Sequence, residues 1–129
     1  MKLALGTVQF GLPYGISNQS GKVIREDVKR ILTLSRASGI DTIDTAIAYG
    51  DSEACLGAAG IEGFNIITKL PTIPESVADV GCWVRDQVHA SLHRLGLQTA
   101  YGLLMHQPKQ LLGLKGKAVV QALERLKVE

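Results

Sequence analysis

The chain has 129 residues, of which 46% are hydrophobic and 20% are charged, a composition typical of one folded domain and not of a disordered segment. Fourteen basic and twelve acidic residues leave a formal charge of +2, without the arginine-rich stripe that would indicate a nucleic-acid module. No apolar run reaches the roughly 20 residues that a membrane span requires, and the opening residues lack the apolar stretch of a signal peptide, so we expect a cytoplasmic protein without membrane contact.

The first half of the chain predicts two units, each a strand followed by a helix. In the first unit, residues 3–10 favour a strand, and apolar positions recur at spacings of three and four between residues 24 and 38, which is typical of an amphipathic helix. Gly39 supplies a stop signal at the carboxyl end of that helix. The second unit comprises a strand over residues 40–46 and a short helix over residues 51–59.

The second half of the chain repeats this order. A strand is predicted at residues 64–70 and a helix at 76–95, followed by a strand at 100–105 and a helix at 116–127. Strands that alternate with amphipathic helices imply parallel pairing with right-handed crossovers. The predicted fold is therefore α/β, with four consecutive β/α units.

Polar side chains stand at the carboxyl ends of the predicted strands, where parallel α/β folds concentrate their chemistry. Asp44 ends the second strand and Tyr49 lies just beyond it, while Lys69 ends the third strand and His106 follows the fourth. Singly, the aspartate could cap a helix, the tyrosine could be a packed loop aromatic and the histidine could simply be exposed. Lys69 is less easily explained, because a lysine after an apolar strand is partly desolvated and needs a partner.

Together, these four residue types indicate acid–base chemistry. A lysine ammonium beside a tyrosine hydroxyl stabilises the phenolate, and a neighbouring aspartate holds the lysine charged and in place. A nearby histidine can donate a hydrogen bond to a substrate oxygen. Such a tyrosine is able to give a proton to a carbonyl, or take one from an alcohol, near neutral pH.

Two other sets of residues are better explained without a site. His89 and His93 are one helical turn apart, a spacing that could bind a metal, but a solvated helix face is the simpler interpretation. Cys55 and Cys82 form no Cys-x-x-Cys pair and have no histidine at a ligand spacing, so we expect free thiols, as in a reducing cytoplasm.

The stretch from Gly39 to Glu53, followed by Leu56-Gly57, resembles the aldo-keto reductase signature. The likeness extends along the whole chain in order, through Leu5-Gly6-Thr7, Ile67-Thr68-Lys69, Ser91 to Leu97 and Leu103 to Pro108. The opening residues 6–11, together with residues 14–16, are similar to a bacterial branch of this family that is associated with polysaccharide or sugar biosynthesis.

This resemblance implies a (β/α)8 TIM-type barrel, of which residues 1–129 would be the N-terminal half. It implies reduction of an aldehyde, ketone or sugar carbonyl with NADPH, or alternatively NADH, and no metal. By the same resemblance, Tyr49 is the general acid, Lys69 activates it, Asp44 pairs with Lys69, and His106 orients the substrate carbonyl.

The resemblance also implies binding residues around these four. Thr7 and Asp44 are expected near the nicotinamide ribose, and Gln9, Phe10 and Gln107 are weaker candidates for the substrate side. The family places most cofactor contacts in the second half of the barrel, so the activity of the 129 residues alone is left open.

A half barrel has two open edges, so the sequence also allows interpretations other than a complete reductase. The first and fourth strands would display unpaired backbone groups, so we expect self-association or a missing C-terminal half. A non-catalytic half barrel or assembly module is the alternative to an enzyme. A lyase with Lys69 as a Schiff-base amine is a weaker one, because it leaves Asp44 and Tyr49 unexplained.

Overall fold

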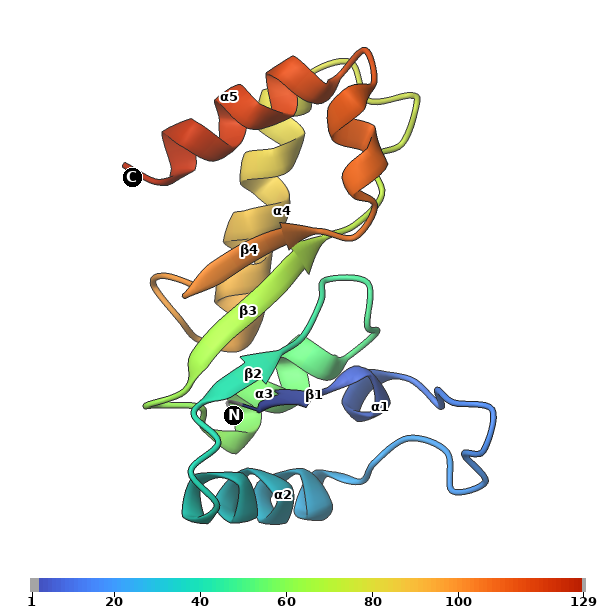
Figure 1. The fold of residues 1–129 in the computed structure, drawn as a ribbon, viewed down its shortest axis with the longest axis vertical. Helices are drawn as coiled ribbons and strands as arrows, with labels where there is room; N and C mark the ends of the chain where they lie inside the picture. Colours follow the sequence, from blue (N-terminus) through green and yellow to red (C-terminus); the bar gives the residue numbers. More distant parts are fainter. Residues whose placement is uncertain (1–2, 129) are drawn as a thin grey trace.

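The computed structural model of the chain describes residues 3–128; Met1, Lys2 and Glu129 lie outside the described residues. Its strands form one sheet in the order β1-β2-β3-β4, and every neighbouring pair is parallel (Figure 1). The strands are β1 (Ala4–Gly6), β2 (Thr42–Asp44), β3 (Asn65–Leu70) and β4 (Gly102–Met105). Sequence order and spatial order thus coincide, as in the successive strands of a β/α barrel.

Each strand is followed by one or more helices, and α4 shows the clearest start and stop signals. They are α1 (Val8–Gly11), α2 (Arg25–Ala37), α3 (Ser52–Ala59), α4 (Val80–Leu95), a 3₁₀-helix (Pro108–Leu112) and α5 (Gly116–Leu126). Asp79 caps α4 by accepting a hydrogen bond from the Cys82 amide at 2.9 Å, and Gly96 ends the helix with a φ of 69°. Such a left-handed residue at a helix end is most easily a glycine.

The structure shortens several of the predicted elements, and for two of them the local cause is clear. The strand predicted over residues 3–10 ends at Gly6, and α1 follows it. This short helix packs tightly against the turn before α3, since a Cβ on Gly11 would lie 1.7 Å from the Tyr49 carbonyl oxygen. The helix predicted over residues 76–95 begins at Val80, because Asp79 is its cap.

All of the core lies between the sheet and its helices. One buried cluster joins α2, α3 and the first three strands, and comprises Phe10, Val28, Leu32, Ile43, Cys55, Leu56, Ile61, Ile66 and Leu95. A second joins β3, α4 and α5, and comprises Leu70, Ile73, Val80, Val84, Val119 and Ala122. Figure 1 shows α3 and α4 behind the strands and α5 across the far end of α4.

The opposite face of the sheet is uncovered in the described part of the chain. Alternate residues of β3 are buried against the helices, so Lys69 between them points to the other face. Leu104 lies directly across from Lys69 in β4 and is 49% exposed. In a closed barrel this face is the interior, which makes the sheet of this chain a half barrel with free edges at β1 and β4.

Two smaller features also bear on the expectations from sequence. Cys55 is buried, Cys82 is exposed, and both are free thiols. Among residues 3–128, no helix combines the length and the apolar character needed to cross a bilayer.

Candidate active site

Four polar side chains meet at the carboxyl end of the sheet, and each is placed there by its own element. Asp44 is the last residue of β2 and Lys69 is the penultimate residue of β3. Tyr49 lies in the turn between β2 and α3, and His106 directly follows β4. The His106 amide still donates to the Leu70 carbonyl at 2.9 Å, so the sheet pairing extends up to this residue.

Lys69 is the centre of the group. Its Nζ donates to Asp44 Oδ1 at 2.5 Å and to the Thr45 carbonyl at 3.0 Å. The lysine side chain is 16% exposed and that of the aspartate 35%, so the pair is only partly open to water. The carboxylate therefore supplies the partner that a desolvated lysine at the end of an apolar strand requires.

Tyr49 lies against both Lys69 and His106. The lysine Nζ is 5.1 Å from the centroid of the tyrosine ring, and the histidine ring packs edge-on at a centroid distance of 5.9 Å. A cation at this distance from an aromatic ring is attracted to it. The structure thus brings together all four residues that the sequence singled out for acid–base chemistry.

The turn that carries Tyr49 is tightly fixed. The Tyr49 amide donates to the Ala46 carbonyl and its carbonyl accepts from the Ser52 amide, both at 3.0 Å. Gly50 has a φ of 54°, a conformation that other residues rarely adopt. Together with the close approach of Gly11, these constraints limit the positions that the tyrosine ring can take.

The remaining candidates from the sequence occupy different surroundings. Thr7 is fully buried, and its hydroxyl donates to the Asp44 carbonyl at 3.0 Å; a cofactor contact for Thr7 stays a prediction. Gln9 is exposed and donates to the Tyr14 carbonyl, and Gln107 is exposed just before the 3₁₀-helix. Phe10 is 3% exposed and belongs to the helix-side core, so its expected place on the substrate side is wrong.

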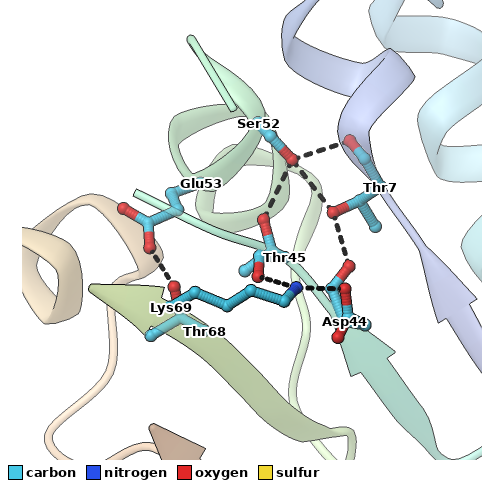
Figure 2. A network of polar contacts seen from close by, with 7 residues as sticks. All are labelled: Thr7, Asp44, Thr45, Ser52, Glu53, Thr68 and Lys69. Atoms are coloured by element: carbon cyan, nitrogen blue, oxygen red, sulfur yellow. Dashed lines mark hydrogen bonds and ion pairs between the residues drawn. The ribbon is translucent and has the colours of Figure 1, made fainter. Parts of the chain in front are cut away.

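Sequence reasoning assigned no role to a set of buried polar residues behind the site. Figure 2 shows Ser52 and Glu53 of α3 in contact with threonines that adjoin Asp44 and Lys69. The sequence offered one indication of this set: a threonine stands next to Asp44 and another next to Lys69, on the helix-facing side of strands that is otherwise apolar. Only tertiary packing shows that these hydroxyls converge on one helical turn.

A second ion pair lies beyond Tyr49 along the chain. The hydrogen bond between Lys22 and Asp51, at 2.7 Å, raises the pKa of the lysine and lowers the pKa of the aspartate, and both groups are solvent-exposed. A cavity of about 620 Å³ is lined by residues 22–26, Asp51, Ala54 and Cys55. None of the four clustered side chains lines it, so this cavity carries none of the chemistry of the cluster.

Comparison with known proteins decides the family. The sequence matches the aldo/keto reductase family over residues 2–129. The chain belongs to the aldo/keto reductase family. None of the curated proteins matches it significantly.

Solved reductase structures share this fold. A Pseudomonas aeruginosa protein, PA4992, described as an aldo-keto reductase, is 31% identical with a TM-score of 0.76; the match covers 96% of this chain and 51% of that one. The aldo-keto reductase AKR11C1 from Bacillus halodurans, solved in its holo form, is 18% identical with a TM-score of 0.71, over 98% of this chain and 42% of that one. The chain spans about half the length of these reductases.

Proposed function

We propose that this chain carries the proton-transfer half of an aldo-keto reductase site, which reduces an aldehyde, ketone or sugar carbonyl with a nicotinamide cofactor. The observation that carries the proposal is the position of Tyr49, with the Lys69 ammonium 5.1 Å from its ring centroid and the His106 ring 5.9 Å away. Membership of the aldo/keto reductase family supports the same chemistry.

The proposed proton path uses only these side chains. Tyr49 gives its hydroxyl proton to the carbonyl oxygen as that oxygen gains negative charge. The Lys69 ammonium stabilises the tyrosinate that remains, and Asp44 fixes the position of the ammonium through their hydrogen bond. His106 donates a hydrogen bond to the same substrate oxygen and so orients the carbonyl toward the tyrosine.

The residues at the open face fit one end of a nicotinamide cofactor, which supplies the hydride when bound. Gly6 pairs with Asp44 in the sheet, and a Cβ on Gly6 would meet no atom within 4 Å, so open space adjoins the half-exposed carboxylate. A carboxylate in that position can accept a hydrogen bond from a ribose hydroxyl. The Lys69 ammonium is already paired with Asp44 and is therefore not available to bind a phosphate group. These side chains thus fit the ribose end of the cofactor and not its phosphates. We propose NADPH, with NADH as the alternative.

Cofactor binding by the chain is the experiment that tests this proposal. We expect a saturable fluorescence change when the protein is titrated with NADPH, and consumption of NADPH when an aromatic aldehyde is added. Asp44→Ala removes the proposed ribose acceptor and should weaken the binding. A fluorescence signal that does not saturate at millimolar cofactor would refute the proposal for this chain.

We also propose that the open face is covered by a second copy of the chain or by further β/α units. Edge strands with unpaired backbone groups promote association. In the described chain, β1 and β4 are the two edge strands, and each pairs with a neighbouring strand on one side only. Light scattering across a concentration series is expected to give a mass above that of one chain. A compact monomer at every concentration would contradict self-association. In that case, the open face of the sheet would have to be covered by further β/α units and not by a second copy of the chain.

An amine nucleophile at position 69 is the competing chemistry. Lys69 already donates hydrogen bonds to both Asp44 and the Thr45 carbonyl, and an amine nucleophile would have to give up these bonds to attack a carbonyl. Borohydride trapping of a carbonyl compound on Lys69 would favour this alternative over reduction.

A further inference from the structure

Behind the open face, two adjacent residues of α3 connect the strands that carry the proposed chemistry. Ser52 and Glu53 open α3, only three and four residues after Tyr49. They are 0% and 1% exposed, although one is polar and the other is an acid. Figure 2 shows them between β2 and β3, on the side of the sheet away from the Lys69 ammonium. A buried acid is costly unless its oxygens are hydrogen-bonded or paired, so its partners explain its place in the fold.

The two oxygens of the Glu53 carboxylate have different partners. Oε1 accepts hydrogen bonds from the hydroxyls of Thr68, at 2.7 Å, and Ser91, at 2.6 Å. Oε2 accepts from Arg94 Nε at 2.9 Å, and Arg94 Nη2 lies 2.7 Å from the same oxygen without a well-aligned hydrogen bond. The charge of the glutamate is therefore balanced from α4, while one of its oxygens holds β3.

The bond to Thr68 acts on Lys69 through the strand. Successive residues of a strand point to opposite faces, so the Thr68 hydroxyl is directed at α3 while the Lys69 side chain runs to the open face. A shift of β3 at Thr68 therefore moves the lysine relative to Tyr49. Glu53 follows Tyr49 by four residues, so this hydrogen bond connects the segment of the proton donor to the strand of the cation from behind the sheet, in addition to the bond from the Ile47 amide to the Lys69 carbonyl at 3.2 Å.

Ser52 makes the equivalent connection to β2. Its hydroxyl lies 3.1 Å from Thr45 Oγ1 and donates to the Thr7 carbonyl at 2.9 Å. Because each hydroxyl has one proton, Thr45 is the donor to Ser52, while Thr7 donates its own proton to the Asp44 carbonyl. The residue after Asp44 is thus bound to α3 in the same way as the residue before Lys69.

We propose that Ser52 and Glu53 are positioning residues, which set the distance between Tyr49 and the Asp44–Lys69 pair by binding the neighbouring threonines from behind the sheet. This inference deepens the proposed function and rests on it for its catalytic meaning. Its structural content, the placement of the ammonium against the tyrosine ring, is measurable without turnover.

The test compares two hydroxyls that bind the same carboxylate oxygen. Thr68→Val and Ser91→Ala each remove one buried donor to Glu53 Oε1, but only Thr68 adjoins Lys69. The whole chain is labelled with fluorotyrosine and observed by fluorine NMR. Of its three tyrosines, Tyr14 and Tyr101 are exposed and act as internal references. Lys69→Met defines the shift of the Tyr49 signal when the ammonium is absent.

We expect Thr68→Val to move or broaden the Tyr49 signal in the direction that Lys69→Met moves it, and Ser91→Ala to leave the signal in place. Thr68→Ser, which restores the hydroxyl, should return the wild-type signal. Both donor deletions should lower the unfolding midpoint, which shows that the signal does not simply follow stability. If Thr68→Val does not fold, Thr68→Ala takes its place.

Equal displacement of the Tyr49 signal by Thr68→Val and Ser91→Ala would overturn the inference, and so would an unchanged signal in Thr68→Val. The separate result that the wild-type chain neither binds NADPH nor reduces an aldehyde would count against the proposed function alone. The two failures are distinguishable because the NMR comparison involves no cofactor.

Discussion

Replacing Glu53 with alanine is expected to lower the free energy of unfolding by about 3 kcal/mol, a large part of the stability of a domain this size. The substitution leaves two buried hydroxyls, on Thr68 and Ser91, without their acceptor, and deprives Arg94 of its counter-ion. Breaking a buried ion pair costs roughly 3–5 kcal/mol. The lower end applies because the Arg94 side chain is 34% exposed and can regain water. Urea denaturation at one fixed protein concentration measures the loss, since self-association would make stability depend on concentration.

Glu124→Ala provides the matched control. Glu124 also lies in a helix, but on its exposed side, where a substitution usually changes stability by no more than about 0.5 kcal/mol. A loss below about 1 kcal/mol for Glu53→Ala would show that the buried carboxylate contributes little net stability, as some buried ion pairs do.

The order and type of the main elements could be predicted because local pattern and tertiary structure agree there. Apolar spacing identified α2, and the glycine at position 39, with a φ of 74°, ends that helix as expected. The helical turn at Val8–Gly11 could not be predicted from its apolar residues, which equally favour a strand. It is fixed by contact with the Tyr49 turn, 38 residues further along the chain, and that contact leaves no room for a side chain at Gly11.

The candidate site divides in the same way. Asp44, Lys69 and His106 could be located because the ends of parallel strands meet at one edge of a sheet. Phe10 was assigned to the substrate side by the family resemblance alone, whereas α1 turns its side chain into the core. Glu53 gave no signal of burial, since an acid in the first turn of a short helix is ordinarily explained by the helix dipole. Its partners Ser91 and Arg94 come from α4, and sequence spacing cannot show that they face it.

Tyr49→Phe is expected to reduce the rate of carbonyl reduction by about 10²–10⁴-fold while leaving NADPH binding unchanged. The substitution removes only the hydroxyl, so the ring remains between Lys69 and His106 at its present distances of 5.1 and 5.9 Å. A lost proton donor lowers kcat, because the charge that develops on the substrate oxygen is no longer neutralised in the transition state. Cofactor affinity should be insensitive, because Asp44 and the open space beside Gly6 are untouched.

Tyr101→Phe separates this effect from the general loss of a tyrosine hydroxyl. Tyr101 is 71% exposed and immediately precedes β4, outside the cluster of four, so its substitution should leave both rate and binding at wild-type values. The measurements are NADPH consumption with an aromatic aldehyde and NADPH fluorescence titration, on whichever assembly of the chain turns over. If Tyr49→Phe retains the wild-type rate, the proton must come from elsewhere. His106 is then the next donor to test, because its ring also packs against the tyrosine ring. Lys69 is a weaker candidate, because its ammonium is bound to Asp44.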